Sequence, residues 1–184
     1  MRKTKSLWIC CAALIAMLAT SACAVNYQIH QLSANISWAS AINNSGTVAA
    51  AVYDSNVCHA AVFSDLGLLT LLDEGFALGI NNSGYVVGNA GRAAMWSPAG
   101  VLSYLPLPDG ASFSQAMCIN DSSVAAGECW LGTTHVANYI TIWNGAADPL
   151  ILGEGCGIGI NSTGAVVGFT KESGGTHRAF IWTP

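Results

Sequence analysis

One short segment occurs four times in this sequence. Its copies occupy residues 41–50, 79–88, 118–127 and 159–168, and they align without gaps as Ile-Asn, a polar turn and a run of apolar or small residues. The asparagines of the four copies, Asn43, Asn81, Asn120 and Asn161, are 38, 39 and 41 residues apart. A period near 40 residues is typical of repeat folds, in which each unit buries its apolar surface against its neighbours. The sequence therefore predicts four copies of one small unit.

Each unit is expected to form short β-strands. The Asn-containing segment predicts a hairpin, because Asn and Gly tolerate positive φ and the Asn side chain can bond the local backbone. A second motif follows each hairpin and predicts a third strand that ends in an aromatic residue: Phe63, Trp96, Trp143 or Trp182. Segments 68–72 and 101–105 are expected to be fourth strands that lead to the next unit. Because no window carries a helical apolar period over ten residues, the fold class is predicted to be all-β.

The two ends of the repeat region complement each other. Segment 27–32 stands where a fourth strand is expected, but no first three strands precede it, and the last unit ends after its third strand. Together these strands make four complete sets of four. The sequence thus predicts a small β-propeller of four four-stranded blades, closed by the N-terminal strand completing the last blade. A linear β-solenoid and a two-sheet sandwich are the alternatives, and neither explains why the ends match.

The first strand of each unit carries large and small residues in alternation. Its small positions, two and four residues before the asparagine, hold only alanine, glycine or cysteine: Ala41, Gly79, Cys118 and Gly159, and Ala39, Ala77, Ala116 and Gly157. Because successive side chains point to opposite faces of a sheet, one face of each first strand is nearly flat. Strands of this kind are expected where neighbouring units crowd together.

The two motifs in this order resemble the bacterial extracellular HAF repeat, named for its His-Ala-Phe triplet. The resemblance covers about residues 37–182 and implies an exported, propeller-like repeat protein, without an assigned activity. Some copies depart from the family's pattern. Ser123 replaces the turn glycine of the third unit, Tyr139 replaces the His or Arg there, and only the last unit keeps the Ala-Phe pair, at Arg178-Ala-Phe180.

Residues 1–24 have the composition of a secretory signal peptide. Arg2, Lys3 and Lys5 precede an uncharged apolar run at 7–19 and the small residues of 20–24. A helix of that run is only about 20 Å long, which is short for a hydrocarbon core of about 30 Å. Cleavage after Ala24 and lipidation of Cys23 at a lipobox-like site remain alternatives. The mature chain, 25–184, is expected to be one four-repeat domain without a transmembrane span, in the periplasm, on the outer membrane surface or outside the cell.

The charge balance excludes some partners. The sequence is 52% hydrophobic and 9% charged, which is too apolar for a disordered chain. Without residues 1–24, Arg92, Lys171 and Arg178 face ten acidic residues, a net charge of −7. Such a surface would be repelled by nucleic acid, so no nucleic-acid partner is predicted.

The mature chain keeps an even number of cysteines: Cys58, Cys118, Cys129 and Cys156. In an exported protein this count favours up to two disulfides, with three possible connectivities that the sequence leaves open. Their spacing matches no zinc motif, and no repeated carboxylate is present. No metal or cofactor is therefore predicted.

Most charges of the mature chain fall in the loops expected on one rim of the propeller. Histidines and aromatic residues join them there, and these residues form the candidate ligand-binding set: Tyr53, His59, Glu128, Trp130, His135, Lys171 and His177. The third-unit loop 128–138 is expected to be its centre. By contrast, the repeated asparagines are interpreted as backbone-bonding turn residues, and the repeated Trp and Phe residues as core.

No sequence motif of a catalytic site is present in a suitable context. Hydrolase, metalloprotease and phosphate-binding signatures are missing, and the spacing of the acidic residues selects no catalytic pair. The sequence therefore favours a non-catalytic exported binding module for an unidentified protein or glycan at the cell envelope. A lectin-like glycan binder is the alternative, and a hydrolase of propeller fold is a further one.

Overall fold

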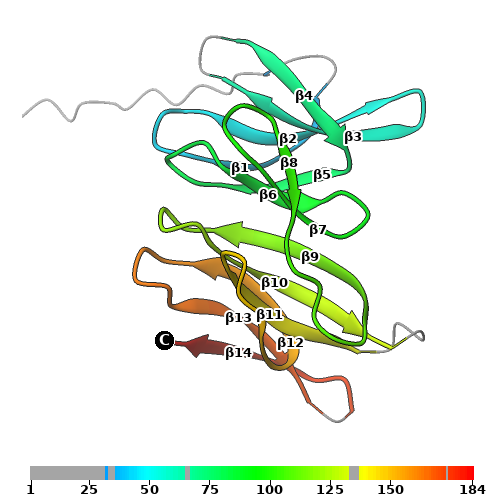
Figure 1. Cartoon of the computed structure of the whole chain (residues 1–184), viewed down its shortest axis with the longest axis vertical. Coiled ribbons are helices and arrows are strands. Elements are labelled where there is room, and N and C mark those ends of the chain that lie inside the picture. Colours follow the sequence, from blue (N-terminus) through cyan, green and yellow to red (C-terminus); the bar gives the residue numbers. More distant parts are fainter. Residues whose placement is uncertain (1–31, 33–35, 65–66, 133–136, 173) are drawn as a thin grey trace, which may run out of the picture. The chain divides into compact units, whose positions relative to one another are not determined.

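The structure is a computed structural model, which describes residue 32 and residues 36–64, 67–132, 137–172 and 174–184 (Figure 1). Within these residues the chain forms fourteen β-strands and no helix. The strands pair in antiparallel fashion into three sheets. The predicted all-β fold class is confirmed. The expected signal peptide, Cys23 and the expected strand 27–32 lie outside the described residues, except for Leu32.

The sheets follow the sequence repeats in chain order. The first sheet holds the first repeat, in the order β1 (Ile36–Ile42), β2 (Val48–Asp54), β3 (Val57–Phe63) and β4 (Leu69–Glu74). The second sheet holds the second repeat, in the order β5 (Phe76–Ile80), β6 (Val86–Asn89), β7 (Ala93–Trp96) and β8 (Leu102–Tyr104). The six-stranded third sheet holds the third and fourth repeats: β9 (Ala111–Ile119), β10 (Val124–Leu131), β11 (Asn138–Asn144), β12 (Leu150–Ile160), β13 (Val166–Lys171) and β14 (His177–Trp182).

Strand β12 belongs to two repeats. Its first half, from Leu150 to Glu154, pairs with β11, and its second half, from Gly155 to Ile160, pairs with β13. The backbone turns between the halves at Gly155, whose φ is 140°. A Cβ there would lie 2.0 Å from the Phe169 backbone oxygen, and Gly75, which enters the second repeat, meets the Asn89 oxygen in the same way. Only glycine fits these two crossings.

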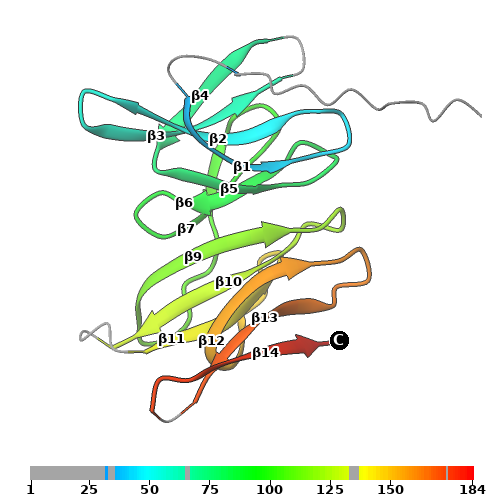
Figure 2. The ribbon, with the colours of Figure 1, turned by 180° about the vertical axis from the view of Figure 1, so that it is seen from behind.

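The repeats follow one another in a stack (Figure 2), and apolar side chains fill the contacts between them. In each repeat from the second onward, the aromatic residue that ends the third strand packs against alanine or other apolar side chains of the preceding repeat. Trp96 shares a core cluster with Ala49 and Ala60, Trp143 shares one with Val87 and Ala93, and Trp182 packs against the cluster that holds Ala126 and Ile142. The core interpretation is confirmed for Trp96 and Trp143, which are fully buried, whereas Phe63 and Trp182 are half-buried.

The small face of the first strands lies at close contacts between repeats. Ala77 and Ala116 are fully buried. A Cβ on Gly79 would lie 3.0 Å from the Cα of Cys118, so β5 and β9 approach almost backbone to backbone. The expectation that crowding selects small residues is confirmed at these positions.

The turn asparagine of each of the first three repeats carries out two tasks. Asn81 Oδ1 accepts the backbone N–H groups of Ser83 and Tyr85, at 3.1 and 2.9 Å, which closes its own turn. Its Nδ2 donates to the backbone oxygen of Asn120 in the next repeat, at 3.1 Å. Asn43 donates in the same way to Asn81, and Asn120 to Asn161. We call these four residues the asparagine ladder.

A second row of bonds runs beside the ladder. The backbone N–H of Asn44 donates to Asn82 Oδ1, and that of Asn82 donates to Asp121 Oδ1, both at 2.8 Å. In both rows the donor belongs to one repeat and the acceptor to the next. The interpretation of the asparagines as turn residues is confirmed, and the bonds between repeats add a connection that the sequence did not predict.

The forward face of the fourth repeat, which would meet a further repeat, is open in the described structure. Val167 and Ile181 on this face are 44% and 71% exposed, whereas Val87, at the corresponding place in the second repeat, is fully buried. Among the described residues, the side-chain amide of Asn161 donates to no further repeat. The described strands form three open sheets rather than a closed ring.

The ladder predicts which asparagine is most costly to lose. In Asn81→Ala, two turn N–H groups and the Asn120 carbonyl would lose a partner at a buried site, so we expect the free energy of unfolding to fall by about 2–4 kcal/mol. Asn161→Ala is the comparison, because this exposed residue accepts the corresponding turn N–H groups and also the Thr163 hydroxyl, but donates no bond to a further repeat among the described residues. Its cost should be smaller by about 1–2 kcal/mol in urea denaturation. Equal costs would indicate that Asn161 also donates to another repeat, as closure of the ring requires, whereas a cost of less than about 1 kcal/mol for Asn81→Ala would contradict the importance of the bonds between repeats.

Candidate functional site

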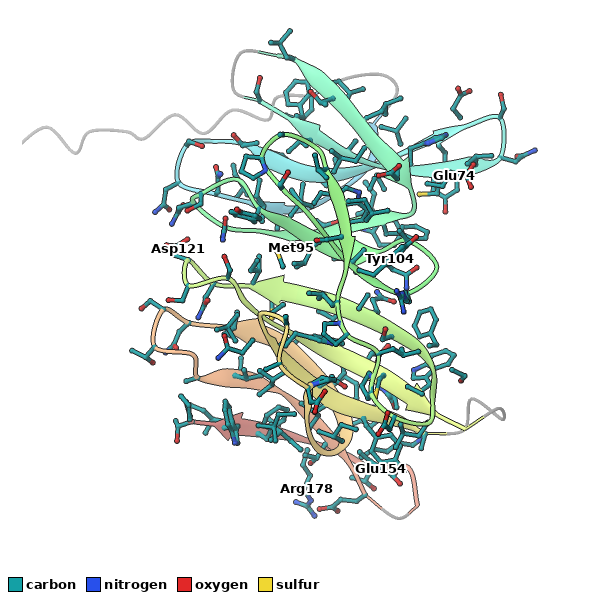
Figure 3. All side chains as sticks on the ribbon, viewed as in Figure 1. Glu74, Met95, Tyr104, Asp121, Glu154 and Arg178 are labelled. Atoms are coloured by element: carbon teal, nitrogen blue, oxygen red, sulfur yellow. The ribbon has the colours of Figure 1, made fainter. Side chains whose placement is uncertain are left out.

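The sheets have two chemically different ends. At the turn end lie the asparagine turns. At the opposite end, which we call the loop end, lie the β2–β3, β6–β7, β10–β11 and β13–β14 connections (Figure 1). Figure 3 labels Glu74 and Glu154 at the loop end and Asp121 at the turn end.

The structure places six of the seven predicted ligand-binding residues at the loop end, in separate pairs. Tyr53 and His59 belong to β2 and β3 of the first repeat, and Glu128 and Trp130 lie on β10 of the third. Lys171 and His177 are cross-strand partners in the fourth repeat. The seventh, His135, lies outside the described residues. The second repeat separates the first pair from the other two, so the set is a row rather than one pocket.

The third-repeat pair is the most highly connected. The Trp130 ring lies 4.9 Å from that of Phe113, its cross-strand partner on β9. Two residues earlier, on the same face of β10, Glu128 accepts a hydrogen bond from the Asn138 side-chain amide at 2.5 Å. Cross-strand aromatic pairs of this kind hold each other's rotamers. The loop end therefore has a pre-ordered aromatic and carboxylate patch at the third repeat.

Aromatic residues also pair with charged or polar groups in the neighbouring repeats. The Arg92 guanidinium lies 4.4 Å from the centre of the Tyr104 ring in the second repeat, and His177 stacks on Phe169 at 4.5 Å in the fourth. Arg178 forms an ion pair with Glu172 at 2.5 Å. Sequence reasoning missed Tyr104, Phe113 and Phe169. The sequence feature that could have identified them is an aromatic residue at the loop end of an expected strand. The residue that each ring contacts depends on the strand register, which the sequence does not give.

A small polar groove lies at the turn end. Its volume is about 210 Å³, and the corresponding turn residues of all four repeats line it. Asp121 supplies a carboxylate there, and hydrogen bonds from the backbone and then the side chain of Asn82 lower the pKa of that carboxyl. The ladder amides are already bonded within the protein. In the described part of the chain, no three His, Cys, Asp or Glu side chains gather as a metal site requires.

All four cysteines of the described structure are unpaired thiols. Burial raises the pKa of the Cys118 thiol to about 12, and burial followed by the nearby Glu128 raises that of Cys156. Cys129 is fully buried, and its pKa is raised for the same leading reason. Since the thiolate is the reactive form, these three groups are poor nucleophiles and metal ligands as they stand. The possible disulfides considered from the cysteine count do not form in this structure.

Comparisons with protein-family models, with curated proteins and with solved structures find no match. The resemblance to the HAF repeat therefore remains a prediction that rests on the two recurring motifs. Within the described residues, no helix has the length and hydropathy that crossing a membrane demands.

The thiols predict an order of chemical modification. Cys58 is the expected first target. It and Cys118 are half-buried while Cys129 and Cys156 are buried, and desolvation raises the pKa of Cys118 to about 12, whereas at Cys58 a hydrogen bond with Tyr53 partly offsets the desolvation that raises its pKa. We expect iodoacetamide to label Cys58 first, and Cys118, Cys129 and Cys156 only after denaturation in urea, as read by peptide mass spectrometry. A Cys58→Ser control should lose the early label, and early labelling of Cys118 would contradict the described packing.

Proposed function

We propose that this chain is a non-catalytic, exported binding module whose loop end contacts a partner at the cell envelope or outside the cell. The observation that carries the proposal is the row of aromatic pairs along this end, one in each of the second, third and fourth repeats. Export rests on the signal-like composition of residues 1–24 and on the resemblance to an extracellular repeat.

The chemistry of the row suits recognition. Aromatic rings supply large contact area at a small entropic cost, and a polar tip or neighbour fixes orientation. Tyr53 and Tyr104 are half exposed, so part of this area is open to solvent. Arg178 pairs with Glu172 and Arg92 lies over the Tyr104 ring, so the surface carries charges of both signs. A partner of low net charge fits such a surface better than a polyanion does.

The non-catalytic part of the proposal rests on what the carboxylates already do. Glu128 is held by the Asn138 amide, and Glu172 is held by Arg178. Glycoside hydrolysis needs one carboxyl group that can give up a proton and another free to act on the sugar. Two loop-end acids with committed partners support binding over hydrolysis.

We also propose that the four repeats close into a four-bladed propeller, in which segment 27–32 completes the fourth blade. That segment lies outside the described residues. The proposal is supported by the exposed apolar pair Val167 and Ile181 and by the Asn161 amide, which would continue the ladder onto the Asn43 carbonyl. Closure would bury this apolar face and remove the open edge of β14.

The binding proposal predicts a loss at the loop end. Trp130→Ala should weaken retention on envelope fractions of the source organism by about tenfold or more, because buried aromatic anchors dominate most interfaces. Tyr104→Ala, at an exposed ring, should weaken retention without touching the core. Val101→Ala is the control, since it changes an exposed apolar residue at the turn end. Unchanged retention in both aromatic variants would refute the proposal.

The closure proposal predicts a stability effect at the fourth repeat. If Ile181 is buried in a closed ring, Ile181→Asp should cost more than about 2 kcal/mol in urea denaturation, because an unpaired carboxylate would be buried. Val101→Asp, at a comparably exposed residue, should cost less than about 0.5 kcal/mol. If both substitutions are neutral, the face of the fourth repeat is open in solution and the ring is not closed.

A further inference from the structure

Two corresponding grooves lie between neighbouring repeats near the turn end. One, of about 430 Å³, separates the third and fourth repeats, and the other, of about 390 Å³, separates the first and second. Gly164 and Pro184 in the former take the places of Gly84 and Pro98 in the latter. Both volumes fall in the range of small-molecule sites, about 300–1,000 Å³. The repeat therefore builds this kind of groove, and its chemistry depends on the residues that differ.

The tryptophan beside the groove is the main difference. Trp96 and Trp143 are fully buried, and their indole N–H groups donate to Asp73 Oδ2 at 3.0 Å and to the Pro106 oxygen at 2.8 Å. Trp182 is half-buried and lines the groove between the third and fourth repeats. Among the described residues its Nε1 has no acceptor, and no described side-chain nitrogen is buried without a partner. Its indole N–H is thus not sealed inside the protein as those of Trp96 and Trp143 are.

The polar residues that line the two grooves differ as well. Asn144 and Asp148 are exposed in the groove beside Trp182, and no hydrogen bond within the described residues engages either side chain. The corresponding residues of the other groove are Ser64, whose hydroxyl accepts the Leu68 backbone N–H, and Leu68 itself. Hence the groove at Trp182 combines an aromatic side chain with an amide and a carboxylate that have no partner among the described residues.

We propose that the groove formed by Ile142, Asn144, Asp148 and Trp182 binds a neutral saccharide of one to three rings. The C–H face of a pyranose packs on an aromatic ring, while its hydroxyl groups both donate and accept hydrogen bonds. Asp148 accepts from hydroxyls, Asn144 both donates and accepts, and the Trp182 ring supplies the packing surface. An apolar ligand would leave these groups desolvated without partners, and an anionic ligand would meet the Asp148 carboxylate in a chain of net negative charge.

This site is separate from the loop end, so it can be tested independently. The probes are cellotriose, lactose and N,N′-diacetylchitobiose, with digalacturonic acid as the anionic comparison. Binding to the purified protein is followed by calorimetry and by the indole N–H signals in NMR spectra, in which Trp182→Phe identifies the Trp182 signal. We expect saturable binding of at least one neutral probe, with a shift of the Trp182 signal and none for digalacturonic acid.

The variants separate recognition from folding. Asp148→Ala and Asn144→Ala change exposed side chains without partners among the described residues, so they should weaken binding about tenfold each while stability is unchanged. Trp182→Phe keeps a ring but removes the donor, and should weaken binding less than Trp182→Ala. Leu68→Ala, at the corresponding place in the other groove, should have no effect.

Two results would overturn the proposal: no saturable binding of any neutral probe at millimolar concentration, or binding that survives Asp148→Ala and Trp182→Ala unchanged. Retention on envelope fractions through Trp130 would then still support the loop-end proposal. Loss of retention in the Trp130 variant together with intact saccharide binding would leave this groove as a site of its own.

Discussion

The asparagine at each turn is the residue on which the rest of the structure depends. Its side chain must accept two backbone N–H groups inside its own turn and donate one hydrogen bond to the carbonyl of the next turn. Among the short side chains only Asn offers an oxygen acceptor and a nitrogen donor at once. Aspartate could close the turn but could not donate. The four copies therefore keep Asn at this position, while the following residue varies among Asn44, Asn82, Asp121 and Ser162.

The direction of the ladder makes the two terminal repeats unlike. Every bond runs from the amide of one repeat to the carbonyl of the next, so the stack has a donor side and an acceptor side. The core is asymmetric as well, because Trp96 and Trp143 each pack in a cluster with residues of the preceding repeat. In the fourth repeat the forward face, with Val167 and Ile181, has no such partner among the described residues. Because every repeat uses the same two faces, the last repeat of such an array has one face that must either be covered or be exposed to solvent.

The local features of this fold could be predicted from the sequence, because they depend on residues close together in the chain. The repeat, the all-β class, the turn role of Asn81 and the buried Trp96 and Trp143 all follow from motif and periodicity. The bonds between repeats could not be predicted. They join turns that are 38 to 41 residues apart in the chain, and the sequence does not give the distance between those turns in space. The pairing of Phe113 with Trp130 was also missed. It depends on the register of β9 against β10, which shifts at two places.

The candidate sites follow from the different roles of the turn end and the loop end. The asparagine turns hold the repeats together at one end, so the loop end is released from that task and can carry different residues in each repeat. Because the unit is repeated, a residue that departs from the pattern in one repeat can be compared with the corresponding residue in another. Trp143 and Trp182 end the same motif, yet one is sealed by the Pro106 carbonyl and the other faces a groove. The position holds a buried, hydrogen-bonded indole in the second and third repeats and a half-buried indole in the fourth, and the proposed saccharide site uses this difference.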